Sequence, residues 1–176
     1  MATSSADGFS LIEVLIALFV LAVGVIGAAG MQLTALRMAQ QAAFQSTALH
    51  LALDMAEMMR GYAPHRQLDD ASNPYLAIDM QALVDVTPTE FADVEISRWL
   101  QRVRDELPGA RVRICRDAQA WDAASAQYRW ACTHTPNAAI TIKIGWPDKT
   151  QPEQSAGGAH KHFAPVIVMP IVLPAI

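Results

Sequence analysis

The sequence predicts an α+β fold in which a long N-terminal helix leads into a small globular domain. Three observations carry this prediction. An uncharged apolar run covers Val14–Met31, and apolar residues then recur at helical spacing as far as Arg60. After Pro108 the apolar residues alternate with the period of two that is typical of strands. A length of 176 residues fits one domain with an appendage.

The apolar run has the length of a membrane span. Hydrophobic residues make up 52% of the chain and charged residues 17%, which is rich in apolar and poor in charged residues for a soluble domain. The eighteen residues Val14–Met31 carry no charge, and such a stretch is long enough to cross a bilayer as a helix. The net charge of −4 and the absence of a basic patch exclude a typical nucleic-acid-binding protein.

One helix is expected to run without a break from about Ser10 to about Arg60. No proline occurs in this stretch, and Gly61 followed by Pro64 indicates where it stops. The second half of the helix shows one apolar stripe, which predicts a face buried in the globular domain more readily than a recognition surface. The stripe consists of Phe44, Ala48, Leu51, Met55 and Met58.

The remainder is expected to contain one further helix and several strands. Thr89 is a candidate N-cap for a helix that ends at Pro108-Gly109. Alternation predicts a strand at Val112–Ile114 and a half-buried strand at Ile140–Ile144. Shorter candidates are Tyr128–Cys132 and an edge strand at Val166–Met169, bounded by Pro165 and Pro170.

The most specific pattern lies at the N-terminus, in the run Gly8-Phe9-Ser10-Leu11-Ile12-Glu13-Val14. Glu13 is the only charge between Asp7 and Arg37. A carboxylate near the edge of a membrane helix is costly unless it is paired or hydrated, so its presence points to a function.

This run resembles the prepilin processing motif of type IV pilins and type II secretion pseudopilins. The resemblance implies a pilin fold, in which the long helix packs on a small antiparallel β-sheet. It implies leader cleavage between Gly8 and Phe9, N-methylation of Phe9, and pairing of Glu13 with the terminal amine of a neighbouring subunit. The alternative is an ordinary secretory signal or signal anchor, with Gly27-Ala28-Ala29 as a passable cleavage site.

The leader departs from the family pattern because Met1–Gly8 contains no lysine or arginine. The first basic residue near the apolar run is Arg37, on the far side. The positive-inside rule alone would therefore orient the helix the other way. The expected orientation, with the leader in the cytoplasm and the globular domain in the periplasm, rests on the resemblance.

The chain is expected to consist of four segments. These are a leader at residues 1–8, a transmembrane helix at 9–33, an amphipathic half-helix at 34–62 and an α+β globular domain at 63–176.

Within the family, Leu21–Leu36 and Leu53–Arg60 resemble the PilV group of minor pilins. This implies a non-enzymatic subunit that primes pilus assembly near the tip, located in the bacterial inner membrane and then in the pilus fibre. The implied partners are other minor pilins, the major pilin, the prepilin peptidase/methyltransferase and the inner-membrane assembly platform. The alternatives are a minor pseudopilin of type II secretion, or a membrane-anchored adhesin or DNA-uptake pilin.

Three glycines and two cysteines have expected structural roles. Gly24, Gly27 and Gly30 are expected either to loosen the helix during assembly or to let neighbouring helices approach. Cys115 and Cys132 are expected to pair in an oxidising compartment, the alternative being two buried free thiols.

The sequence contains no recognisable catalytic or metal-binding pattern. The sequence has no Gly-x-Ser-x-Gly, phosphate loop or HExxH. His160 and His162 in a Gly-rich loop, and the pair Asp69-Asp70, lack the ligand spacing of a metal site. We therefore expect no cofactor.

Overall fold

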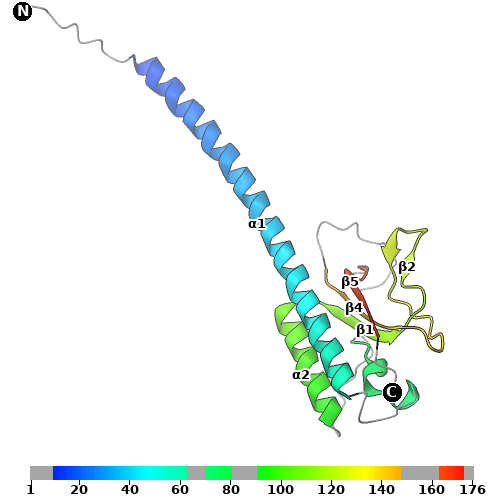
Figure 1. Cartoon of the computed structure of the whole chain (residues 1–176). Coiled ribbons are helices and arrows are strands. Elements are labelled where there is room, and N and C mark those ends of the chain that lie inside the picture. Colours follow the sequence, from blue (N-terminus) through cyan, green and yellow to red (C-terminus); the bar gives the residue numbers. More distant parts are fainter. Residues whose placement is uncertain (1–9, 63–69, 81–90, 148–162, 173–176) are drawn as a thin grey trace, which may run out of the picture. The chain divides into compact units, whose positions relative to one another are not determined.

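The computed structural model describes residues 10–62, 70–80, 91–147 and 163–172. The chain divides into two compact units, Met1–Ala42 and Ala43–Ile176. Helix α1 (Leu11–Tyr62) contributes to both (Figure 1).

The described part of the first unit is the N-terminal part of α1. The bounds of the whole helix, Leu11–Tyr62, agree with the predicted helix to within two residues at each end. Every residue from Ser10 to Gln40 is exposed. Apolar side chains on all sides of this helix therefore lack a partner among the described residues.

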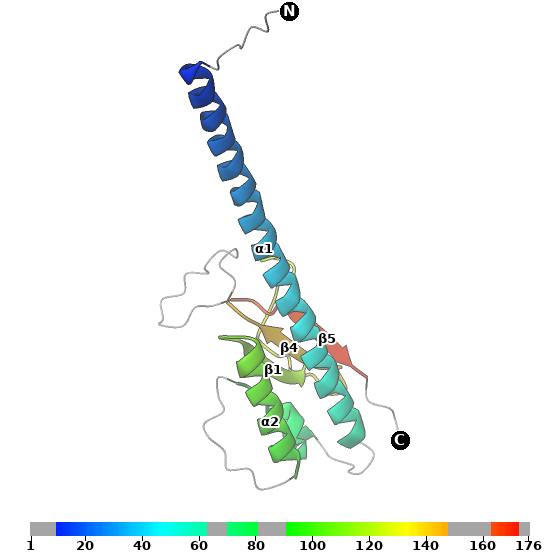
Figure 2. The same cartoon turned by 90° about the vertical axis from the view of Figure 1, so that its left-hand side faces the viewer.

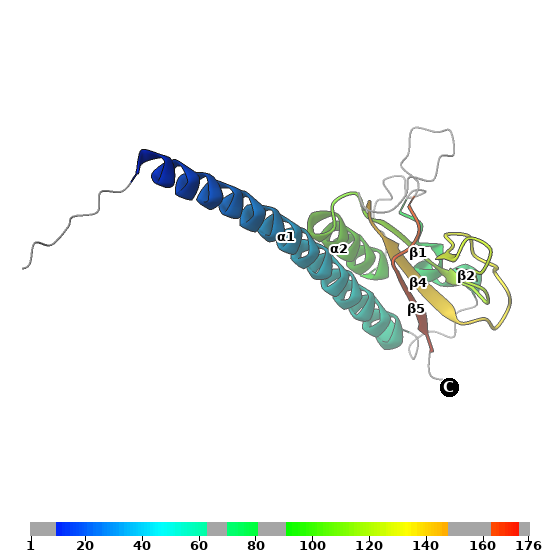
Figure 3. The ribbon, with the colours of Figure 1, turned by 90° about the horizontal axis from the view of Figure 1, so that it is seen from above.

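The second unit has a helical layer on one face of a sheet. The C-terminal part of α1 and helix α2 (Phe91–Glu106) lie side by side (Figure 2). They cover an antiparallel sheet whose strands are ordered β1-β4-β5 (Figure 3). The strands are β1 (Arg111–Arg116), β4 (Ile140–Gly145) and β5 (Ile167–Ile171). This arrangement confirms the predicted α+β class with its long N-terminal apolar helix and small antiparallel sheet domain.

The core of the second unit lies between these layers, and α1 contributes a buried stripe to it. Ala48, Leu51 and Met55 are buried as the spacing predicted, whereas Phe44 and Met58 are only partly buried. The face is turned slightly from the predicted one. Its remaining buried members are Ala52, Ala56 and Met59. The helical layer is joined by a hydrogen bond, which the Trp99 Nε1–H donates to the Leu51 carbonyl at 3.0 Å.

Helix α2 ends where Pro108-Gly109 predicted. Gly109 adopts a φ of +74°, the left-handed conformation that glycine provides at helix C-termini. The Ala110 N–H then donates to the Leu107 carbonyl at 3.0 Å. The predicted N-cap Thr89 lies outside the described residues.

The strand at Ile140–Ile144 exists, but the prediction that it is half-buried is wrong. All six residues of β4 are buried. Strands β1 and β5 flank it, and Ile142 and Ile144 face the helices within the core. On the opposite face, Lys143 is covered by the chain between β1 and β4, and Gly145 is covered by Trp130, Phe163 and Ala164.

Two strand boundaries also differ from the prediction. The segment Tyr128–Cys132 is not one strand: only β3 (Gln127–Tyr128) forms, paired with β2 (Trp121–Asp122) in a short hairpin. The C-terminal strand has the predicted edge position in the described sheet, but it continues through Pro170, which lies opposite Thr141. An edge strand tolerates proline because one side of its backbone makes no ladder bonds.

We expect Gly145→Ala to lower the free energy of unfolding by about 1–3 kcal/mol, the usual effect of overpacking. A Cβ at Gly145 would lie 2.8 Å from the Ala164 carbonyl oxygen and 2.9 Å from Cζ2 of Trp130. Chemical denaturation of the full chain in detergent measures the change. Gly61→Ala is the matched control, since nothing lies within 4 Å of its Cβ position. Equal stability of the two variants would contradict the prediction.

Candidate functional site

The candidate site at the N-terminus is built on the first turns of α1. The Glu13 N–H donates to the Ser10 carbonyl at 3.0 Å, which places the carboxylate in the first turn of the helix. A negative charge is favourable there because the helix dipole is positive at its N-terminus. Glu13, Val14, Ala17, Leu18 and Leu21 line one shallow hollow along the helix. The one charge therefore adjoins an apolar strip.

The part of α1 that follows Glu13 in the sequence has the properties of a membrane span. It is the one helix in the described part of the chain that is long and apolar enough to cross a bilayer, with a mean hydropathy of 2.7 in its most apolar window. No part of this apolar stretch is buried within the protein, whereas the core helix of a soluble domain is mostly buried. Exposed side chains such as Leu11 at 79%, Phe19 at 70% and Ile26 at 72% need lipid or other helices as surroundings.

One family model matches the N-terminal region of the chain. Residues 3–29 match the family model described as the prokaryotic N-terminal methylation motif. This match supports a type IV pilin-like protein. No curated protein and no solved structure matches the chain significantly. The matched motif covers the N-terminal part of the chain, which includes the beginning of α1.

The processing residues predicted from the sequence fall within the matched motif. Gly8 and Phe9, the predicted cleavage and methylation positions, lie outside the described residues. Glu13 lies in the first turn of α1. Gly24, Gly27 and Gly30 lie within the continuous helix, and nothing approaches their Cβ positions within 4 Å. The Thr34 hydroxyl donates to the Gly30 carbonyl at 3.1 Å.

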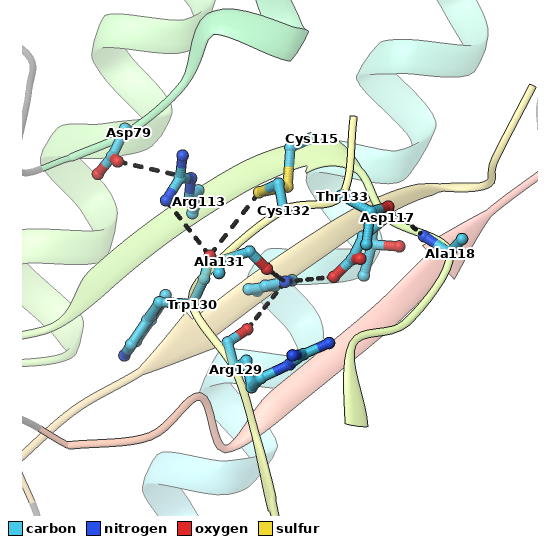
Figure 4. The surroundings of a disulfide bond; sticks show 12 residues. Asp79, Arg113, Cys115, Asp117, Ala118, Arg129, Trp130, Ala131, Cys132 and Thr133 are labelled. Carbon is cyan, nitrogen blue, oxygen red and sulfur yellow. Dashed lines mark hydrogen bonds and ion pairs between the residues drawn. A yellow bond between two sulfur atoms is a disulfide. The ribbon is translucent and has the colours of Figure 1, made fainter. Parts of the chain in front are cut away.

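The second predicted feature, the disulfide, lies in the globular unit. Cys115 in β1 and Cys132 are joined by a disulfide with a Cα–Cα distance of 6.2 Å (Figure 4). This confirms the predicted pairing and removes the alternative of two free thiols. The bond closes the segment that carries the β2–β3 hairpin.

Beside the disulfide the structure shows a buried charge pair that the sequence analysis missed. The Lys143 ammonium donates to Asp117 at 2.5 Å, and both side chains are fully buried. Burial by itself would raise the pKa of the Asp117 carboxyl. The hydrogen bonds from Lys143 and from the Gln119 N–H, together with the Lys143 charge, hold that pKa below its ordinary value.

An aromatic anchor that was also missed lies next to this pair. The Trp130 indole N–H donates to the Phe163 carbonyl at 2.6 Å, and the two rings meet edge to face. The Arg111 guanidinium lies 4.4 Å from the centre of the Trp130 ring. The closeness of Trp130 to Gly145 leaves no room for a larger residue. No sequence motif predicts this anchor, because its contacts come from segments that are far apart in the chain.

Most residues of the two weak metal candidates lie outside the part of the chain that the structure describes. His160, His162 and Asp69 lie outside the described residues. Asp70 is engaged with Arg116, whose Nη2 donates to it at 2.7 Å. Within the described ranges no group of three or more His, Cys, Asp or Glu side chains is arranged to hold a metal ion.

Proposed function

We propose that the chain is a minor pilin of the PilV type, which primes type IV pilus assembly at or near the pilus tip. The observation that carries this proposal is the coincidence of the methylation motif with an apolar helix that is exposed on all sides and bears one carboxylate. A helix of this kind suits a subunit that leaves the bilayer to enter a bundle of similar helices. The PilV assignment rests on the resemblance of Leu21–Leu36 and Leu53–Arg60.

The proposed mechanism uses Phe9 and Glu13 together. Cleavage after Gly8 would create a terminal amine on Phe9, four residues before Glu13. An amine and a carboxylate held within one apolar bundle each reduce the desolvation cost of the other. The Phe9 amine of one subunit and Glu13 of its neighbour would thus fix the axial position of the two helices during assembly.

The proposed partners follow from this pathway. The prepilin peptidase/methyltransferase and the inner-membrane assembly platform would act on the chain in the inner membrane, with the globular domain in the periplasm. The other minor pilins and the major pilin would contact it in the fibre. The disulfide between Cys115 and Cys132 agrees with a domain that folds in an oxidising compartment.

Glu13→Gln tests this mechanism, since it removes the charge with little change of shape. We expect the variant to be inserted and cleaved normally, but its amount in sheared pili should fall at least about tenfold because the neighbour's amine is left unpaired. Quantitative immunoblotting of sheared and membrane fractions measures this. Glu57→Gln is the matched control, as Glu57 is exposed in the globular unit and contacts Arg60. Incorporation of the Glu13 variant at the wild-type level would contradict the proposed pairing of Glu13 with the Phe9 amine.

Deletion of the gene separates the pilus from a type II secretion pseudopilus. Loss of surface pili and twitching with normal exoprotein secretion is expected for the minor pilin. The reverse phenotype would favour the pseudopilin.

A further inference from the structure

The buried ammonium of Lys143 has a complete set of acceptors. Besides Asp117 at 2.5 Å, its Nζ donates to the Arg129 carbonyl at 2.8 Å and to the Ala131 carbonyl at 2.7 Å. An ammonium has three protons, so every donor is used. A lysine that is 0% exposed is tolerated only with such pairing.

These acceptors lie on both limbs of the segment that the disulfide closes (Figure 4). Asp117 follows Cys115 on the first limb. Arg129 and Ala131 precede Cys132 on the second limb. We call residues 115–132 the disulfide loop. One side chain on β4 therefore ties together the same two chain ends as the covalent bond.

We propose that Lys143 is a positioning residue that closes the disulfide loop without a covalent bond, and so holds Cys132 against Cys115 before oxidation and after reduction. The lysine belongs to β4, the central strand of the described sheet, which is paired on both sides. Trp130 adds a second attachment through the Phe163 carbonyl, and Arg113 donates to the Trp130 carbonyl at 3.4 Å.

The seated loop depends on the charge of Lys143. With Lys143 in place, the fully buried Asp117 side chain has a charged partner, and both carbonyls accept a hydrogen bond. Without the ammonium, seating the loop would bury the Asp117 charge unpaired and leave both carbonyls without their donor. Such a change is strongly unfavourable. In a reduced chain that lacks the ammonium, the disulfide loop would therefore detach from the sheet, and the two thiols would separate.

The first test measures the effective concentration of the two thiols in the full chain, purified in detergent. The protein is equilibrated with mixtures of reduced and oxidised dithiothreitol, free thiols are trapped with a maleimide, and the species are separated by mass. For Lys143→Met we expect an effective concentration about 10- to 100-fold below wild type, since breaking a buried pair carries a penalty of this order or more. An unchanged value overturns the proposal.

Val103→Ala is the matched control for a general loss of stability. Val103 lies in α2 and is 0% exposed in the core, and it takes part in none of the loop hydrogen bonds named above. Under conditions where both variants remain folded, the control should keep the effective concentration within about twofold of wild type, because distant sites act independently. If the control lowers it as much as Lys143→Met, the effect reflects global stability and the proposal fails.

A second measurement does not depend on whether Lys143→Met folds. The double variant Cys115→Ser, Cys132→Ser removes the covalent closure and leaves Lys143 in place. Hydrogen exchange followed by mass spectrometry should show continued protection of the loop amides, including the Gln119 N–H that donates to Asp117 at 3.0 Å and the Arg129 N–H that donates to the Ala120 carbonyl at 2.9 Å. Exchange of these amides as fast as in an unfolded chain would overturn the proposal.

Discussion

Replacing Gly8 with leucine is expected to leave the leader Met1–Gly8 attached to the protein. The peptidase of the proposed pathway must bring the chain backbone against its catalytic groups at the Gly8–Phe9 bond. A glycine allows this close approach because it has no side chain, and leucine would block it. The mass of the protein purified from the membrane fraction should retain the leader, and the methyl group on Phe9 should be absent.

Ala6→Leu is the matched control, because it adds a bulky residue two positions earlier within the same leader. This variant should be cleaved and methylated as the wild type is. Normal processing of the Gly8 variant would refute the motif assignment, even if the protein still entered the membrane.

Replacing Trp99 with alanine is expected to lower the free energy of unfolding by about 3–5 kcal/mol, the usual loss for a large buried aromatic residue. Trp99 is 1% exposed and is the largest of the fully buried side chains. Its indole N–H also donates to the Leu51 carbonyl of α1 at 3.0 Å. The variant would therefore leave a cavity in the core and remove a hydrogen bond between the two helices of the globular unit.

Trp121→Ala provides a control of the same chemistry. Trp121 lies in the β2–β3 hairpin, is 47% exposed and meets Tyr128 edge to face. Its loss should cost about 0.5–1.5 kcal/mol, the range of an aromatic pair contact. Denaturant unfolding of the full chain in detergent, followed by circular dichroism, compares the two. A Trp99 variant no less stable than the Trp121 variant would show that the helical layer does not depend on this anchor.

The sequence predicted those features that depend on local periodicity. The stripe around Leu51 and Met55 and the alternation at Ile142 and Ile144 were enough for the helical layer and the central strand. The pairing of the two cysteines was predicted for an oxidising compartment, and the disulfide is present. The processing motif was recognisable because its residues are contiguous, and the family match covers them.

The prediction was wrong where a segment distant in sequence changes the surroundings. Lys143 between two isoleucines has the pattern of a strand with one wet face, but the disulfide loop covers that face. The supposed strand Tyr128–Cys132 fails for a related reason. The carbonyls of Arg129 and Ala131 accept from the Lys143 ammonium. Periodicity describes neighbours along the chain and contains no information about such a cover.

Pro170 has a consequence for how many copies of the domain can be crowded together. It lies in β5, the outer strand of the described sheet, opposite Thr141. Unpaired edge strands invite strands of other molecules to add to the sheet, and such pairing leads to aggregation. A proline offers no N–H, so a strand approaching β5 would meet an interrupted row of donors. The domain can therefore be concentrated on a membrane surface with less risk that neighbouring sheets fuse through this edge.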